Sequence, residues 1–356
     1  MKKILLFILI VLTGIVIMAC KGIPVNQSKN DFDIPPYNAG DTALAEITID
    51  TVVYDKTEEV YVTGPYGATI IGADPSFVDS KAYDYHKGVL ITGRTVILSP
   101  FIMSKYEVTQ ELYEVVMDGN QDNLNKTPSS FRKFPAENEE QKFRPVESIS
   151  WYDAVYFCNE LTKKTLGESQ QVYTITNITI DSSKHTITSA NVTMDNTKKG
   201  YRLPTEAEWE FAARGGDTSK ADWNYLFAGH PTEDGKIYSD ITNSGLETVG
   251  WYSGNSGSKT HQVGMKAENA LGIFDMSGNV GEFCYDWLDN ATAGDNGEST
   301  VLNPTGSSNG RHRQARGGSW WLDANSAIVC GRGGFLPGIG RNDMGFRLVR
   351  SVITEE

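Results

Sequence analysis

Hydrophobic positions recur at helical spacing in only a few segments of the chain. The clearest segment starts at Ser150 and Asp153, whose spacing is typical of a capping box, where side-chain oxygens accept hydrogen bonds from free backbone N–H groups. Apolar side chains then recur at helical spacing up to Gly167, and they are Val155, Cys158 and Leu161. This pattern predicts a helix that begins after Ser150 and ends before the glycine.

A second capping box predicts a second helix. Thr205 and Glu208 have capping-box spacing. Glu210 lies one helical turn before Arg214, so the two charges can pair on one face of the helix. The glycines at 215–216 then end this helix.

The remaining periodic signal consists of a weaker helix and one hairpin. Residues 109–117 have a helical pattern, while 172–180 and 185–194 alternate between apolar and polar positions around the turn 181–183. From Gly215 onward the chain is predicted to be mostly loop, and such a long irregular stretch is usually functional or held by bound ions. The pattern as a whole predicts a mixed α+β, loop-rich fold.

Residues 1–19 are typical of an export signal peptide. Two lysines precede an apolar run over 4–17, and Ala19 stands directly before Cys20. The run is shorter than the roughly 20 apolar residues that cross a bilayer. A cysteine in this place is the lipid acceptor of bacterial lipoproteins, which the segment resembles, and more than one acyl chain would anchor it stably. An ordinary signal peptide with an incidental cysteine, and an uncleaved membrane helix, are the alternatives.

Residues 20–54 are polar and proline-containing, so we predict that lipidated Cys20 begins a flexible tether. The net charge of −13 argues against nucleic acid and anionic lipid headgroups as partners, because both require basic patches. We therefore expect a membrane contact through the lipid anchor only. The expected location is the bacterial outer membrane or cell surface, after export.

Five sequence blocks carry a specific resemblance to a known family. They include Arg-Leu-Pro-Thr-Glu-Ala-Glu-Trp-Glu, Met-Ser-Gly-Asn-Val-Gly-Glu and Gly-Phe-Arg, and the blocks lie at 101–109, 201–216, 271–282, 316–320 and 345–347. In this order they resemble blocks of the formylglycine-generating-enzyme, or sulfatase-modifying-factor, family. The resemblance implies an α+β fold over residues 55–351. That fold is a loop-rich variant of the C-type-lectin fold, with two main helices and small antiparallel sheets.

The resemblance also implies one calcium site. The family's calcium loop uses a side-chain oxygen, three backbone carbonyls and a glutamate, and the matching residues are Asp275, Met276, Gly278, Val280 and Glu282. Several oxygen ligands on a glycine-containing loop suit a hard cation. Gly281 stands where the family usually has tryptophan, which loosens the packing without removing a ligand. An acidic turn that binds no ion is the alternative.

Catalysis by the family's mechanism is not expected, because its two thiols are missing. The related enzymes oxidise a substrate cysteine with two cysteines that also bind copper, and thiolates are ligands that copper(I) selects. The matching positions are Leu322 and Ala327, so we expect neither copper nor enzyme activity. Cys330 resembles a framework cysteine of non-catalytic relatives. Cys158, Cys284 and Cys330 have no metal-ligand spacing, and one disulfide among them stays open.

The tail over residues 321–343 resembles the variable region of proteins diversified by retroelements, among them lipid-anchored proteins with the same fold. In that class, randomised codons encode a set that lacks Lys, Glu, Gln, Met and Trp, and none of these occurs over 322–343. If exposed, the apolar residues of this tail would form a binding patch, whereas packing inside the loops is the alternative. The residues predicted to bind ligand are Trp321, Leu322, Asp323, Asn325, Ser326, Gly331, Phe335, Leu336, Gly338, Ile339 and Asn342.

These observations favour a non-catalytic binding protein on the cell surface. Its variable loops, carried on a lectin-like scaffold, would bind an unknown protein or glycan ligand. One alternative is an oxidase of the formylglycine-generating type, which copper binding would reveal. Another is a structural or motility-associated envelope lipoprotein, which would have a fixed partner and an invariant tail.

Overall fold

The computed structural model describes residues 46–63, 67–75, 86–231, 244–288 and 300–352. The predicted signal peptide, Cys20 and most of the predicted tether lie outside these ranges. The helices are α2 (Gln110–Met117), α3 (Trp151–Thr165), α4 (Glu206–Ala213) and α5 (Ser244–Val249), with 3-10 turns η2 (Gln141–Phe143), η3 (Glu168–Gln170), η4 (Ala221–Asn224) and η5 (Ala324–Ala327). Within the described ranges, no helix is both long and apolar enough to cross a bilayer.

The strands are short, apart from those of one hairpin and one central strand. They are β1 (Thr48–Ile49), β2 (Val52–Val53), β3 (Glu59–Tyr61), β4 (Ala68–Ile71), β5 (Thr95–Leu98), β6 (Phe101–Ser104), β7 (Tyr173–Asp181), β8 (Thr186–Met194), β9 (Tyr201–Arg202), β10 (Gly281–Trp287), β11 (Thr300–Leu302), β12 (Arg313–Arg316), β13 (Gly333–Phe335), β14 (Met344–Gly345) and β15 (Val349–Ser351). Such short strands have too few residues to show a clear alternation in the sequence.

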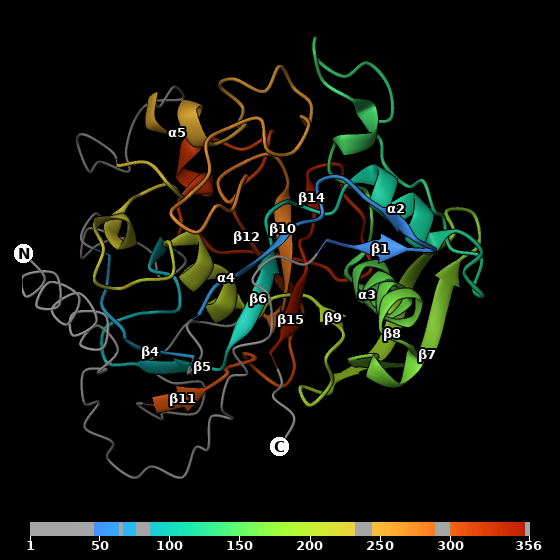
Figure 1. Ribbon diagram of the computed structural model, residues 1–356, viewed down its shortest axis with the longest axis horizontal. Helices are drawn as coiled ribbons and strands as arrows, with labels where there is room; N and C mark the ends of the chain where they lie inside the picture. The colour runs from blue at the N-terminus through green and yellow to red at the C-terminus, as the bar shows by residue number, and fades with distance from the viewer. Residues whose placement is uncertain (1–45, 64–66, 76–85, 232–243, 289–299, 353–356) are drawn as a thin grey trace, which may run out of the picture. The chain divides into compact units, whose positions relative to one another are not determined.

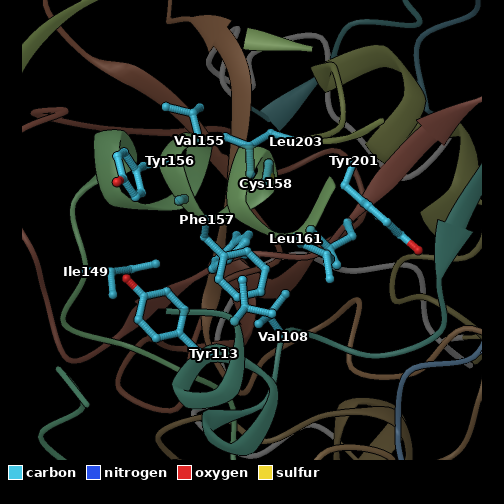
Figure 2. Packing of buried hydrophobic residues seen from close by; sticks show 14 of the residues in the cluster. Val108, Tyr113, Ile149, Val155, Tyr156, Phe157, Cys158, Leu161, Tyr201 and Leu203 are labelled. Atoms are coloured by element: carbon cyan, nitrogen blue, oxygen red, sulfur yellow. The ribbon is translucent and has the colours of Figure 1, made fainter. Parts of the chain in front are cut away.

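Helix α3 begins at the predicted capping box. Ser150 Oγ accepts a hydrogen bond from the Asp153 N–H at 3.0 Å, and the Asp153 carboxylate accepts one from the Ser150 N–H at 3.0 Å. A cap of this kind contributes about 1 kcal/mol. The helix then runs through the main hydrophobic core, where Cys158 and Leu161 are fully buried. Figure 2 shows these side chains gathered with others from α2 and β9.

The predicted hairpin is confirmed as β7 and β8, and α3 holds it in place. The Asp153 carboxylate also accepts hydrogen bonds from the Thr186 hydroxyl and from the Ile187 N–H. Further along the helix, the Asn159 side chain bonds both the N–H and the carbonyl of Tyr173, as a neighbouring strand would. Figure 1 shows the hairpin beside α3.

Helix α4 also matches its prediction, and every one of its residues is buried. Thr205 and Glu208 form the capping box, and Glu210 pairs with Arg214 at 2.8 Å. Gly215 and Gly216 follow with φ of 82° and 72°, a conformation that glycine adopts at little cost. Because burying an unpaired charge is costly, the glutamates of this helix require arginine partners.

Two four-stranded sheets join most strands of the second half of the chain to β3 and β6 of the first half. Their strand orders are β13-β12-β10-β14 and β3-β6-β15-β9. Most pairs are antiparallel as predicted, but β10 pairs with β14, and β11 with β5, in parallel. The expectation of mostly loop after Gly215 holds for the described residues, and the short strands there pair with residues that are distant in the sequence.

The folded domain begins before the predicted boundary between tether and domain at residue 54. Ile47 and Ile49 are almost fully buried in the main core, and β1 pairs with β2 just before the predicted start of the domain. Apolar burial of this kind contributes to stability, so residues 47–53 belong to the folded body and not to the tether.

Candidate ligand-binding site

A cavity of about 330 Å³ lies over the β13-β12-β10-β14 sheet, and the predicted variable tail forms much of its wall. This volume is at the lower end of the range for small-molecule sites, about 300–1,000 Å³. Six of the eleven tail residues predicted to bind ligand line it: Leu322, Asp323, Asn325, Ser326, Gly331 and Phe335.

The part of the tail nearest the cavity is rigidly built. Asp323 caps the turn η5, where its carboxylate accepts hydrogen bonds from the N–H of Ser326 at 3.3 Å and from its hydroxyl at 3.2 Å. Ser277 donates to the Ala327 carbonyl at 2.8 Å, which ties the turn to the loop before β10. Gly318 lies so close that a Cβ there would be 2.8 Å from the Ala327 Cα. The cavity wall is therefore preformed.

Arginines and glutamates form a closed network at the cavity floor. Arg316 is fully buried and pairs with both Glu206 and Glu210, and it also donates to the Gly331 carbonyl. Arg332 pairs with Glu206 at 2.6 Å. Burial alone would raise the pKa of Glu206, but the guanidinium groups of Arg332 and Arg316 override it and lower that pKa. Arg214 shares Glu210 with Arg316, so three arginines share the charge of two glutamates in this network.

One buried hydroxyl in the cavity wall has no hydrogen-bond partner among the described residues. Ser319 is 1% exposed, and its Oγ is left without a donor or acceptor. A buried polar atom in this state costs free energy until a ligand or water bonds it. The sequence did not single out Ser319 as a binding residue, because it belongs to the family block at 316–320.

Most of the other residues around the cavity were also missed by sequence reasoning. His86 comes from a distant segment, and nothing in its local pattern pointed to this wall. Gly281 did carry a signal, since tryptophan is usual there in the family. The missed lining residues are His86, Gly281, Ala315, Arg316, Gly318, Ser319, Arg332, Gly333, Asp343 and Met344.

The remaining tail residues lie outside the cavity. Trp321, Leu336 and Ile339 are 59%, 42% and 52% exposed, and Asn342 is also exposed, so packing inside the loops does not account for them. Gly338 is different, because a Cβ there would lie 2.1 Å from the Thr188 carbonyl oxygen of β8. Its predicted role as a variable contact is corrected, since a larger side chain does not fit.

The two positions that match the family's catalytic thiols cannot replace them. Leu322 lines the cavity and Ala327 is fully buried. Cys330 is also buried, its thiol donates to the His86 carbonyl at 2.8 Å, and burial raises its pKa to about 12. Cys158 and Cys284 are free, buried thiols as well, so the structure has none of the disulfides that the sequence left open.

The predicted calcium loop fits a cation at Asp275. This side chain is buried, its Oδ2 accepts from the Gly264 N–H at 2.7 Å, and its Oδ1 has no partner among the described residues. Burial raises the pKa of Asp275 to about 6. Burial, followed by the negative charges of Asp275 and Glu282, also raises the pKa of Glu107. Excess negative charge therefore surrounds the unpartnered oxygen, as a calcium ion requires.

Glu282 fits the predicted ligand role less well. Both of its oxygens accept hydrogen bonds from Arg347 at 2.6 Å, and one also accepts from Trp209 Nε1 at 2.7 Å. The sequence did not reveal this pair, which joins residues in two separate family blocks. An ion at this loop would be held mainly by Asp275 and by the backbone carbonyls of Met276, Gly278 and Val280, and calcium stays a prediction.

Comparisons with known proteins agree with this architecture. Residues 55–352 match the sulfatase-modifying factor enzyme 1-like domain, and the chain belongs to this family. The structure is similar to Treponema denticola variable protein 1, with a TM-score of 0.64 and 32% identity, covering 88% of this chain and 100% of that one. The predicted resemblance and the predicted fold class are thereby confirmed.

Two relatives are similar to the chain over different lengths. The chain is 32% identical over 306 residues to a protein named chaperone protein LppX from Paenibacillus barcinonensis, covering 80% of this chain and 92% of that protein. It is also 32% identical over 151 residues to the formylglycine-generating enzyme of Streptomyces coelicolor, covering 42% and 46% of the two chains. Similarity over the longer span therefore lies with a protein that is not named as an oxidase.

Proposed function

We propose that the protein is an exported, lipid-anchored surface lipoprotein whose tail and cavity bind a protein or glycan ligand. The observation that carries the proposal is the convergence of six predicted tail residues on one preformed cavity. Exposed apolar side chains beside it extend the available contact surface. A rigid scaffold that carries changeable loops can acquire new specificities without refolding.

The oxidase alternative is disfavoured by the chemistry of the cavity. A copper(I) site needs soft ligands, and Leu322 and Ala327 provide none. Cys330 faces the His86 carbonyl, and its raised pKa keeps it in the thiol form, which is a poor nucleophile. Copper(I) titration and incubation with a sulfatase-motif peptide test this point, and detectable binding or turnover would reverse the ranking.

Anchoring at Cys20 rests on the N-terminal pattern, and diversification rests on the tail. The similarity to a Treponema variable protein supports diversification as a proposal. The experiment is to sequence the 3′ end of the gene and its neighbourhood in several isolates. We expect substitutions at Leu322, Asp323, Asn325 and Phe335, with Gly338 unchanged, beside an adenine-rich template and a reverse transcriptase. An invariant tail with no such cassette would favour a fixed-ligand or structural lipoprotein instead.

A direct binding test uses ligands captured by the parent protein. Replacing Trp321 and Phe335 by alanine removes two aromatic contact surfaces of the tail, one exposed and one lining the cavity. Aromatic anchors often dominate interface energies, so we expect at least one captured ligand to be lost. If every ligand binds the double variant as well as the parent, the tail is not the binding surface.

A further inference from the structure

The charges around the cavity are unequally compensated. Four charged side chains line it, namely Arg316, Arg332, Asp323 and Asp343. The two arginines share Glu206 and Glu210 with the buried Arg214, and Asp343 pairs with Arg341 at 2.8 Å.

Asp323 is the exception. Its carboxylate accepts hydrogen bonds from Ser326 only, and no basic side chain of the described residues forms an ion pair with it. It is exposed, whereas Arg316, Ser319 and Met344 are buried in the cavity wall. The exposed mouth of the cavity therefore carries a negative charge without an ionic partner among the described residues.

The other walls suit an aliphatic stem with a polar end. Leu322, Phe335 and Met344 provide apolar surface, and Ser319 Oγ is a hydrogen-bonding atom without a partner among the described residues. Phe335 already contacts a cation, since the Arg341 guanidinium lies 5.0 Å from its ring centroid. A cation at that distance is attracted by the negative face of the aromatic ring. The cavity thus combines an aromatic ring, a free carboxylate and room for methylene groups.

We infer that the cavity takes a lysine or arginine side chain of a partner protein. The inference rests on the proposed binding function and specifies the chemistry of its ligand. The net charge of −13 attracts a basic partner at long range, and Asp323 then fixes the charged end of the side chain at the mouth. An anionic ligand is disfavoured at the mouth, because the Asp323 carboxylate would repel it.

The experiment measures binding of three short peptides to the full-length chain in detergent by isothermal titration calorimetry. The peptides are acetylated, amidated pentaglycines in which the central residue is lysine, arginine or norleucine. Norleucine keeps the aliphatic stem and lacks the charge. We expect the basic peptides to bind up to about fivefold tighter than the norleucine peptide, because an exposed ion pair contributes no more than that factor. The difference should shrink in 1 M salt, where the Debye length falls to about 3 Å.

Asp323→Asn is the decisive variant. Asparagine caps a helical turn as well as aspartate does, so η5 keeps its cap while the cavity loses its free charge. We expect this variant to bind the lysine peptide up to about fivefold more weakly, and to bind the norleucine peptide as the parent does. The matched control is Asp217→Asn, because the Asp217 carboxylate likewise accepts from a serine N–H and hydroxyl, in a turn outside the cavity lining.

Several outcomes would overturn the inference. These are equal binding of the lysine and norleucine peptides, absence of binding by all three, or unchanged lysine binding in Asp323→Asn. So would tighter binding of a neutral methyl glycoside than of the basic peptides, with competition at the same site. In that last case the proposed binding function would survive, because Leu322→Trp, which fills the cavity, would abolish glycoside binding. The ligand class alone would then be wrong.

Discussion

The loop 275–282 and the tail 321–343 are in contact, but they differ in burial and pairing. Most polar groups of the loop are buried and paired, whereas apolar groups of the tail are exposed. In the loop, Asn279 donates to the buried Glu107, and Glu282 is held by Arg347 and Trp209. In the tail, apolar side chains are exposed and a carboxylate at the cavity mouth has no ionic partner among the described residues. We call the loop with its buried, paired groups the frame, and the exposed residues of the tail the surface. Substitutions in the frame should destabilise the fold, whereas the surface can accept them.

Direct hydrogen bonds join the two regions. Ser277 of the loop donates to the Ala327 carbonyl at 2.8 Å, and the Gly281 N–H donates to the Asp343 carbonyl at 2.8 Å. The displayed residues therefore keep a defined geometry although they are partly exposed. Preorganisation of this kind lowers the entropic cost of binding a ligand.

The largest expected effect comes from breaking the frame. Arg347→Ala removes the partner of Glu282 and leaves a fully buried carboxylate unpaired. We expect a loss of about 3–5 kcal/mol in the free energy of unfolding, measured by urea denaturation. Lys126→Ala breaks the exposed pair with Asp118 and serves as the control, with no measurable change expected. Equal effects of the two variants would refute the distinction between frame and surface.

Calcium is expected to stabilise the same frame. An ion at Asp275 binds the folded chain only, so calcium at a hundredfold excess over its dissociation constant should add about 2.7 kcal/mol. Thermal unfolding with calcium and with a chelator measures this gain, and Asp275→Asn should abolish most of it. If the chelator leaves the melting temperature of the parent unchanged, the segment is an acidic turn without an ion.

A smaller effect is expected inside the tail itself. Gly338→Val places a side chain against the Thr188 carbonyl, so the hairpin or the tail must shift, at a cost of about 1–3 kcal/mol. Ile339→Ala changes an exposed neighbour and should stay within about 0.5 kcal/mol. Chemical denaturation of both variants compares them. A tolerated valine would show that Gly338 belongs to the changeable surface after all.

The smallest effect concerns the three buried thiols. Burial raises the pKa of Cys158, Cys284 and Cys330, so iodoacetamide should leave all three unmodified in the folded protein at neutral pH. Mass spectrometry of peptides before and after unfolding in urea measures the modification. Rapid labelling of Cys330 in the folded state would show that the cavity opens toward it and would revive the question of a reactive thiol.

The local devices of the fold could be predicted from the residues themselves. The boxes Ser150–Asp153 and Thr205–Glu208, and the pair Glu210–Arg214, connect groups within one turn of helix. Their geometry follows from spacing alone, because a helix fixes the distance between such positions. The family blocks supplied the architecture that these devices could not. They also indicated the tail as the region to examine.

The tertiary structure decided which tail residues face a cavity and which are constrained. Asp323 lines the cavity together with His86, and Gly338 lies against Thr188, both from segments far away in the chain. Glu282 likewise pairs with Arg347, which lies 65 positions further along the chain. No local sequence pattern encodes these contacts, because they depend on how whole strands and loops pack. The sequence alone therefore determined the elements and the family, whereas long-range packing determined the cavity, its charge and the limits on its variation.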